Sequence, residues 1–457
     1  SLSRKTISGP GLATPLVWSY TYGSGPSELI SGAPGTCTNE SICALSKTNT
    51  VTDPTGAKTE HIFGMRYFLN DGKLLGSRTI SSSGTVLRTE TLEYLTDAEA
   101  EGQPFPDFFS GIWGGDDNRA TYLRPLKRKT ITQDGSSATY VFRVESYDSW
   151  ARPVTVTKSS SLGYSRTEST VYHDNLTAWI VGLVKSISCV SCGGTGTGML
   201  MSQTDYDATT ALPLKTYSFG KLQQSFTYNA DGTTATIKDG RNNTITLSSW
   251  YRGVPRKVTY PATTDQPTAV SESATVDDNG WIKSLTDENG YTTTYDHDVM
   301  GRTKLIDYPD GDTVNWISTT RSFMPSATSY YGLPVGAWYQ IVQTGNDRKA
   351  TFFDAFWRPV IEDTYDYTDS ATIAATRSIV VKRYDENGRV VFQSYPVRTL
   401  TSYTDPNLKG VRTEYDALGR VTAVKQDSEI GVLTSKTEYL DGLRIQVTNP
   451  RGKQTLS

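Results

Sequence analysis

The sequence predicts an all-β protein built as an array of antiparallel β-hairpins. Its 457 residues include 27 tyrosines and 39 glycines, a composition typical of strands joined by tight turns. A six-residue pattern recurs along the chain at hairpin-sized intervals. Asp-Gly and Asn-Gly pairs, which supply the backbone conformations of tight hairpin turns, also recur. These observations favour many short hairpins over the two to four compact domains that the length alone would allow.

Charge and composition exclude three classes of protein. There are 45 Lys and Arg residues against 48 Asp and Glu residues, which gives a formal net charge of −3. The chain therefore lacks the excess of basic residues that is typical of nucleic-acid-binding proteins. No stretch approaches the roughly 18–20 apolar residues of a membrane helix. Aromatic residues make up 11% of the chain, which argues against extensive disorder. We therefore expect a folded, β-rich protein without a nucleic acid partner, a membrane span or a cofactor.

The recurring pattern consists of an aromatic residue, Asp, two variable residues, a turn residue and Arg. A residue with high strand propensity, such as Val390 or Val421, follows soon after the Arg. We expect the pattern residues to have structural roles in the repeat. The five clearest copies contain Tyr147, Asp148 and Arg152; His297, Asp298 and Arg302; Phe353, Asp354 and Arg358; Tyr384, Asp385, Gly388 and Arg389; and Tyr415, Asp416, Gly419 and Arg420.

The spacing of the copies indicates the size of the repeat. Less regular copies begin at positions 206, 228, 250 and 276, so the steps leading to His297 are 22, 22, 26 and 21 residues. The steps from Phe353 to Tyr384 and from Tyr384 to Tyr415 are 31 residues each and contain polar inserts. Because insertions are tolerated at loop tips, these steps predict one β-hairpin per repeat.

The residue types in the pattern suit a tight turn. A glycine after two variable residues can adopt the positive φ that such a turn needs. The Asp carboxylate can accept hydrogen bonds from turn amides, as in an Asx-turn. For the Arg, two roles remain open: it can lie over the aromatic ring of a neighbouring copy, or it can pair with an Asp.

The pattern Tyr-Asp-x-x-Gly-Arg followed by a strand resembles the RHS/YD-repeat family. Residues 287–295 are similar to the linking segment of that family, and the resemblance covers about residues 131–457. His297 and Phe353 depart from the pattern, because the family has Tyr at these positions. We therefore expect a repeat array over 131–457. Residues 1–130 are expected to form a divergent N-terminal β region, with a plug or loop around 97–119.

The resemblance also implies a function. In this family the hairpins join edge to edge into a long curved or spiralling sheet that forms a hollow shell. Bacterial members enclose a C-terminal toxin in such shells, and animal relatives act in cell adhesion. The resemblance thus implies a non-enzymatic structural segment of an exported bacterial protein, secreted or at the cell surface, that encloses or presents another domain. Its partners would be other segments of the same protein. The alternative is a surface-displayed module that binds glycans or a partner protein.

The two ends of the sequence favour a fragment of a larger protein. The chain begins with Ser1 and has no apolar signal segment, and it ends shortly after a segment, 448–453, that resembles a linking turn. The toxin-bearing members of the family carry a self-cleavage core after the repeats, and no such segment is present. We expect any cargo or cleavage domain to lie outside this sequence.

Four cysteines form two close pairs in the sequence, Cys37 with Cys43 and Cys189 with Cys192. The second pair has the spacing of a redox site or of half a zinc site. A glycine-rich segment rather than a helix follows it, and the two pairs are about 150 residues apart. We therefore expect two local disulfides that hold loops in shape in an exported protein.

No catalytic or metal site is expected. The sequence has three histidines, His61, His173 and His297, and it lacks the short motifs of common hydrolases and nucleotide-binding proteins. A triad assembled from distant repeats stays open, because triads depend on geometry rather than on sequence order. The acidic turn 277–280 superficially suits calcium, but Thr275 stands where the first Asp ligand of such a loop is required.

Two aromatic clusters are candidate binding loops. Residues 104–118 combine aromatic residues, glycines and acids, with Phe108, Trp113, Asp116 and Asp117 as the candidate ligand-binding residues. Aromatic faces next to carboxylates suit the binding of a sugar, but a plug that packs on the wall or at the end of the shell is favoured. A second cluster, 330–339, has the same two interpretations.

Overall fold

The structure, a computed structural model, describes residues 1–24, 44–66, 70–106, 123–192, 198–311 and 313–457. In these residues 32 strands form one open sheet, and each strand pairs antiparallel with the next one along the chain. The predicted all-β hairpin array is confirmed. The described part also contains two short α-helices and a 3-10 helix: α2 (Asp97–Ala100), α3 (Ser370–Thr376) and η3 (Asp441–Leu443). None of the described helices is long and apolar enough to cross a membrane.

The strands are short and follow one another closely. The first group is β1 (Arg4–Ile7), β2 (Leu16–Thr21), β3 (Ser46–Thr52), β4 (Lys58–Gly64), β5 (Leu74–Ile80), β6 (Val86–Tyr94), β7 (Leu126–Gln133), β8 (Thr139–Tyr147), β9 (Pro153–Ser160) and β10 (Ser165–Asn175). The second group is β11 (Ile180–Ser191), β12 (Leu200–Tyr206), β13 (Pro213–Ser218), β14 (Lys221–Tyr228), β15 (Thr234–Asp239), β16 (Thr244–Tyr251), β17 (Val254–Thr259), β18 (Ser271–Val276), β19 (Ile282–Thr286), β20 (Thr292–His297) and β21 (Thr303–Asp307). The third group is β22 (Thr319–Pro325), β23 (Trp338–Thr344), β24 (Asp347–Phe353), β25 (Pro359–Asp366), β26 (Ser378–Tyr384), β27 (Val390–Ser394), β28 (Gly410–Tyr415), β29 (Val421–Ser428), β30 (Gly431–Tyr439), β31 (Ile445–Thr448) and β32 (Gln454–Leu456).

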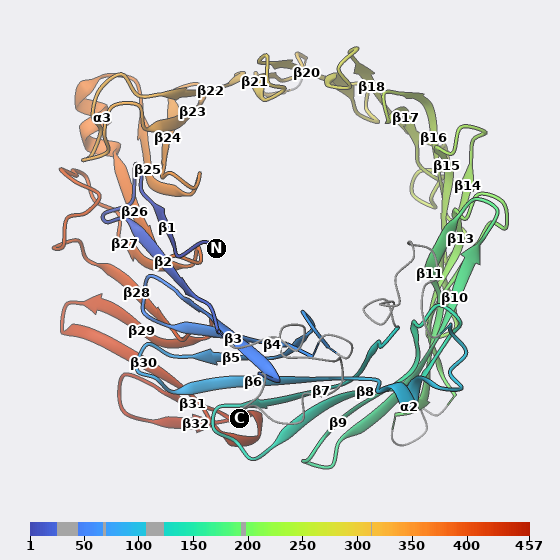
Figure 1. The fold of residues 1–457 in the computed structure, drawn as a ribbon. Helices are drawn as coiled ribbons and strands as arrows, with labels where there is room; N and C mark the ends of the chain where they lie inside the picture. Colours follow the sequence, from blue (N-terminus) through green and yellow to red (C-terminus); the bar gives the residue numbers. More distant parts are fainter. Residues whose placement is uncertain (25–43, 67–69, 107–122, 193–197, 312) are drawn as a thin grey trace.

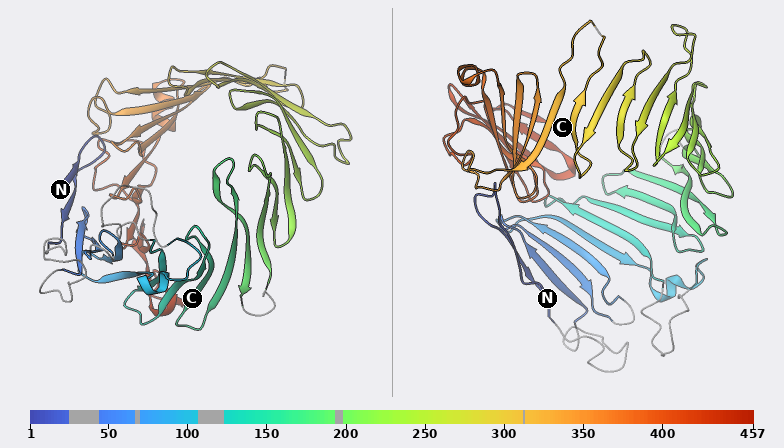
Figure 2. Two further views of the ribbon diagram at one scale, coloured as in Figure 1. Left: turned by 45° about the vertical axis from the view of Figure 1, so that its right-hand side comes forward. Right: turned by 90° about the horizontal axis from the view of Figure 1, so that it is seen from above.

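The sheet curves into a ring, and Figure 1 shows its N-terminal strands near its C-terminal strands. Seen from above, the two ends are displaced along the axis of the ring, as in one turn of a spiral (Figure 2). The first and last strands, β1 and β32, do not pair with each other, so the sheet stays open. A right-handed twist between neighbouring strands accumulates over a long sheet, which accounts for curvature of this kind.

Each repeat step contains two strands. The step from Tyr206 to Tyr228 contains β13 and β14, and the step from Tyr384 to Tyr415 contains β27 and β28. The extra residues of the longer steps lie between strands: α3 follows β25, and residues 395–409 follow β27. Insertions at these loops leave the hairpin ladder unchanged, which is the physical reason for the variable step length.

The buried core is small and divided. The larger cluster includes Val360, Ile361 and Val381 on β25 and β26, with Leu333 packed against them. The second cluster surrounds Tyr147 and includes Phe105, which follows α2. Most other strand residues are partly exposed. A single-layer sheet has no second layer to cover both faces, and this fits a hydrophobic fraction of only 36%.

Candidate functional site

The candidate functional site is the set of turns formed by the repeat pattern, called YD turns below. At Asp385, Oδ1 accepts hydrogen bonds from the backbone amides of Asn387 (3.0 Å) and Arg389 (2.9 Å). Its Oδ2 accepts a bond of 2.5 Å from Nε of Arg389. Gly388 has a φ of 82°, in the left-handed region. One carboxylate therefore satisfies the turn amides and orients the Arg at the same time.

The other four clear copies have the same arrangement. In each, Oδ1 accepts from two turn amides at 2.8–3.0 Å and Oδ2 accepts from the Arg Nε at 2.6–2.7 Å; the acceptors are Asp148, Asp298, Asp354 and Asp416. In two copies Ala151 (φ 60°) and Trp357 (φ 63°) replace the turn glycine. A side chain in this region is strained, so the hydrogen bonds of the Asp hold the turn without help from glycine.

The Arg of each YD turn also reaches the next copy. Its guanidinium lies over an aromatic ring, at 4.7 Å for Arg358 over Tyr384 and 4.6 Å for Arg389 over Tyr415. Arg358 additionally donates from its Nη1 to the backbone oxygen of Asp385 at 2.9 Å. Both roles left open for the Arg therefore occur together, because the side chain pairs with its own Asp and stacks on the next aromatic ring.

The Tyr hydroxyl forms a second link between copies, which the sequence reasoning missed. Tyr384 donates to the backbone oxygen of Pro359 at 2.8 Å, and Pro359 directly follows Arg358. The sequence did contain a signal for this link, because the acceptor Pro359 directly follows Arg358, the Arg of the preceding clear copy. Corresponding bonds of 2.7–3.2 Å are made by Tyr94, Tyr147, Tyr172, Tyr206, Tyr228, Tyr415 and Tyr439.

The two copies without Tyr use other contacts. The ring of His297 lies against Trp281 at 5.6 Å between centroids. Phe353 packs on Phe323 at 5.7 Å, and Arg302 lies over Phe323 at 4.8 Å. An aromatic contact is thus kept in both copies while the hydroxyl link is absent.

The two ends of the sheet meet along a seam, where YD turns of the C-terminal coil contact hairpin turns of the N-terminal coil. Arg420 donates two hydrogen bonds, of 2.8 and 2.6 Å, to the carboxylate of Asp134, which is 286 residues away in the sequence. Burial opposes ionisation of Asp134, but hydrogen bonds from Arg420 and Gln133 hold its pKa below the ordinary value. This is a charge-assisted hydrogen-bond pair between the two coils.

Further contacts extend the seam in both directions. The amide of Ala355 donates to the backbone oxygen of Pro10 at 2.8 Å, and Ser136 donates to Asp441. Gly11 lies so close to Asp354 that a Cβ at residue 11 would be 2.4 Å from the Asp354 Cβ. Successive YD turns therefore meet successive N-terminal turns, and the backbone approach at residue 11 requires glycine.

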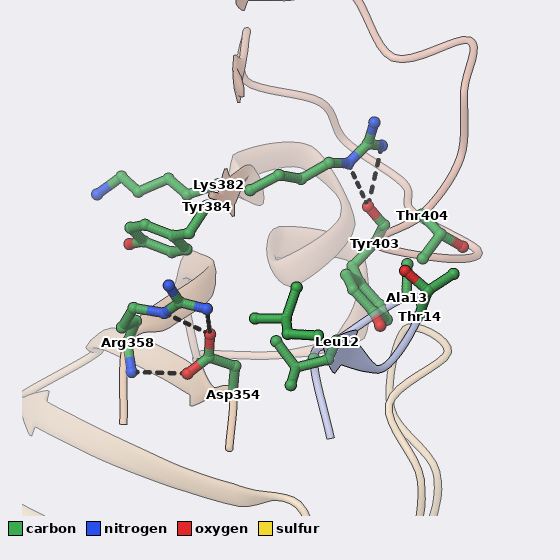
Figure 3. A pocket seen from close by; sticks show the side chains of 12 residues that line it. Leu12, Ala13, Thr14, Asp354, Arg358, Lys382, Tyr384, Tyr403 and Thr404 are labelled. Carbon is green, nitrogen blue, oxygen red and sulfur yellow. Dashed lines mark hydrogen bonds and ion pairs between the residues drawn. The ribbon is translucent and has the colours of Figure 1, made fainter. Parts of the chain in front are cut away.

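A pocket of about 270 Å³ lies at the N-terminal end of the seam (Figure 3). Leu12 projects into it, between Tyr403 and the pair formed by Asp354 and Arg358. The guanidinium of Arg383 donates to the backbone oxygen of Tyr403 at 3.1 and 3.0 Å. Because the pocket is small and its charged groups have protein partners, it is better suited to packing than to ligand binding.

A larger cleft of about 760 Å³ lies where the turns 53–57 and 81–85 approach the YD turns of Asp385 and Asp416. It contains Glu386, whose side chain is only 5% exposed. Burial, with added repulsion from Asp385 and Asp53, raises the pKa of Glu386. Its closest cation is Arg389, at 3.9 Å. The seam therefore combines a well-paired carboxylate at Asp134 with a poorly compensated one at Glu386.

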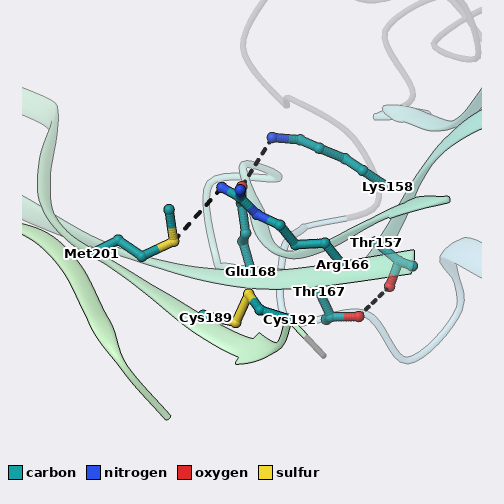
Figure 4. The surroundings of a disulfide bond; sticks show 8 residues. All are labelled: Thr157, Lys158, Arg166, Thr167, Glu168, Cys189, Cys192 and Met201. Carbon is teal, nitrogen blue, oxygen red and sulfur yellow. Dashed lines mark hydrogen bonds and ion pairs between the residues drawn. A yellow bond between two sulfur atoms is a disulfide. The ribbon is translucent and has the colours of Figure 1, made fainter. Parts of the chain in front are cut away.

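Among the residues that the structure describes, the remaining candidates do not assemble into a site. A disulfide joins Cys189 to Cys192 at the end of β11 (Figure 4), while Cys37 and Cys43 lie outside the described residues. The described residues contain no group of three or more His, Cys, Asp or Glu side chains suited to a metal ion. His173 stacks on Tyr206, with 5.1 Å between the ring centroids.

The two aromatic clusters have different outcomes. Phe108, Trp113, Asp116 and Asp117 lie outside the described residues, so their role stays a prediction. In the second cluster, Leu333 is fully buried and Ala337 is 1% exposed, both against the larger core cluster. Part of the second cluster therefore packs against β25 and β26, and the choice between its two interpretations stays a prediction.

The fold and the turns together define a β-hairpin repeat protein whose copies are linked through Tyr, Asp and Arg. A family model described as RHS Repeat matches residues 276–313, which include the YD turn of His297. Residues 276–313 thus match an RHS repeat.

Comparison with solved structures finds similar chains of low sequence identity. The structure titled TcdB2-TccC3-TEV has a TM-score of 0.34 and 10% identity, and the match covers 98% of this chain and 24% of that chain. For TcdB2-TccC3-Cdc42 the values are 0.31, 10%, 96% and 25%. For a Tc holotoxin pore of Photorhabdus luminescens they are 0.28, 9%, 89% and 27%. The chain thus spans about a quarter of the length of these structures. A comparison with curated proteins finds no match.

Proposed function

We propose that the chain is a structural, non-enzymatic segment of an exported bacterial protein, secreted or displayed at the cell surface. In this proposal it forms part of the wall of a β-shell that encloses or presents another domain, such as a toxin. The observation that carries the proposal is the seam, where Arg420 and Asp134 hold successive coils of one curved sheet together. A wall built this way keeps its shape without a solid core, which suits a container better than a catalyst.

The proposed function is tested by measuring whether the chain protects an attached reporter domain from a protease. A protease-sensitive reporter domain is attached after Ser457, and its digestion is compared with that of the free reporter. The matched control carries the same reporter on a chain with Asp134→Ala and Arg420→Ala. We expect slower digestion of the reporter on the unmodified chain than on the seam variant. Equal digestion rates in all three cases would contradict enclosure, and turnover of esterase, protease or glycosidase substrates would contradict a purely structural role.

The second candidate function is binding of a glycan or a partner protein at the surface. It is favoured by two exposed aromatic side chains: Trp357 in the YD turn of Phe353 is 57% exposed, and Trp338 at the start of β23 is 37% exposed. The two rings lie 5.7 Å apart and can stack against a sugar face. A glycan array that compares the chain with its Trp357→Ala variant tests this function. Absence of any glycan bound above background, or binding unchanged in the variant, counts against it.

A further inference from the structure

One face of strands β7 to β10 carries a groove of about 530 Å³ that belongs neither to the YD turns nor to the polar contacts of the seam. The strand register places four side chains in a row across this face. Lys129 pairs with Phe142, Phe142 with Lys158, and Lys158 with Arg166. The row therefore contains one aromatic ring between cationic side chains.

A second row, two residues along each strand, forms the apolar floor. Ile131 pairs with Tyr140, and Tyr140 pairs with Ser160. Leu443, which belongs to η3 of the C-terminal coil, also lines the groove. The groove is thus lined by residues about 300 positions apart, and the contribution of Leu443 depends on the two coils meeting.

The groove has more positive than negative charge. Lys158 and Arg166 both pair with Glu168, with the Lys158 contact at 3.0 Å (Figure 4). Lys129 makes no ion pair with any residue that the structure describes. An unpaired cation next to an aromatic floor is what an anionic aromatic ligand needs.

We propose that this groove binds a small aromatic anion. Its ring system packs on Phe142 and Tyr140, and its anionic group lies beside Lys129. The groove crosses four strands, which at a spacing of about 4.8 Å is roughly 14 Å. That width fits a molecule of two or three rings, and the volume lies within the usual range of small-molecule sites. Packing on the rings supplies most of the affinity, and the cations select the charge.

The test uses two fluorescent probes that differ mainly in charge, 1-anilinonaphthalene-8-sulfonate and the uncharged N-phenyl-1-naphthylamine. We expect saturable binding of the sulfonate at one site per chain. Lys129→Gln should weaken sulfonate binding roughly fivefold while leaving the uncharged probe unaffected, because a single ion pair near the surface contributes about 1 kcal/mol. Phe142→Ala should weaken the binding of both probes.

The matched control is Arg128→Gln, which removes one positive charge from the opposite face of β7. It should leave the binding of both probes unchanged. The proposal is overturned if the sulfonate does not bind saturably, or if Lys129→Gln and Arg128→Gln weaken it equally. It is also overturned if Phe142→Ala has no effect while thermal melting shows that the variant is folded.

Discussion

At the scale of single residues, each position of the YD unit has a separable task. The Asp satisfies the amides of its own turn, the Arg pairs with that Asp and stacks on the next copy, and the Tyr hydroxyl reaches back to the preceding one. Tyr384 makes two of these contacts at once. The Arg358 guanidinium lies over its ring, and its hydroxyl donates to the backbone oxygen of Pro359, the residue directly after Arg358. Copies are thus connected by side chains as well as by the strand ladder.

The hydroxyl link predicts a cost for removing one oxygen atom. Tyr384→Phe keeps the ring under Arg358 and removes the hydrogen bond to Pro359, leaving that carbonyl without its partner. We expect a loss of about 1 kcal/mol in the free energy of unfolding, measured by denaturant titration. Tyr367→Phe is the control, because its hydroxyl has no hydrogen bond to any described residue. Equal losses in the two variants would show that the Tyr384 hydroxyl contributes nothing specific.

The contribution of Glu386 to folding stability should depend on pH with the opposite sign to that of most carboxylates. Its raised pKa means that the folded state favours the protonated form, so its stabilising contribution is present at low pH and is lost as the pH rises through the raised value. Glu386→Gln should therefore raise the melting temperature at pH 7 and change it little at pH 4. Thermal melting at the two pH values checks this, and a variant less stable than the parent at pH 7 would contradict it.

At the scale of elements, the hairpin is set by a left-handed residue in the turn. Gly388 adopts this conformation freely, whereas Ala151 adopts it with a side chain. A Cβ at position 388 would meet only the flexible Arg358 side chain, no closer than 4.0 Å. Any effect of adding a Cβ there therefore comes from the backbone rather than from a clash.

A reciprocal pair of substitutions measures this turn strain. Gly388→Ala should destabilise the protein by about 1–2 kcal/mol, because an L-residue in the left-handed region is strained by that amount. Ala151→Gly should stabilise the protein by less than this, because Ala151 also packs against the smaller core cluster. Denaturant titration of both variants provides the measurement, and changes of the same sign would refute the explanation.

At the scale of the whole molecule, the seam holds the two ends of the curved sheet together. The pairing of Arg420 with Asp134 joins segments that no strand ladder connects. The lowered pKa of Asp134 means that this contribution to stability is present at neutral pH. It is lost as the pH falls through the lowered value. The pairing of Arg420 with Asp134 should therefore persist to a lower pH than a contact made by a carboxylate with an ordinary pKa.

A double-mutant cycle on Asp134 and Arg420 tests the seam at neutral pH. We expect a coupling energy of about 1–3 kcal/mol, because the pair is bidentate and both side chains are largely buried. Hydrogen exchange should speed up around residues 133–139 in either single variant. Arg302→Ala, which breaks an ion pair within one turn, is the control and should leave exchange at 133–139 unchanged. A coupling energy near zero would show that the pairing of Arg420 with Asp134 does not stabilise the fold.

The hollow shape itself is measurable in solution. A compact chain of 457 residues has a radius of gyration of about 22–23 Å, and a curved single-layer wall must exceed this value. Small-angle X-ray scattering of the chain should therefore give a larger radius and a pair-distance distribution shifted to long distances. A radius near the compact value would mean that the ring collapses in solution.

Much of the repeat was predictable because its physics is local. The Asp, the turn residue and the Arg lie within five consecutive positions, so the sequence alone predicts a hairpin turn at each copy. Substitutions such as His297 and Phe353 stayed recognisable, since the neighbouring Asp and Arg were unchanged. The Tyr acceptor was missed because it lies 15–25 residues away, across one strand pair.

The seam and the groove could not be predicted from the sequence. Asp134 belongs to an ordinary Asp-Gly turn, and nothing near it in the sequence indicates Arg420 as its partner. Which turn meets which depends on the curvature summed over more than twenty strands, and a small change of twist per strand would shift every contact. The sequence by itself determined an antiparallel hairpin array, because turns and neighbouring strands are local. Only the tertiary structure decided how the ends meet, because accumulated twist places residues almost 300 positions apart side by side.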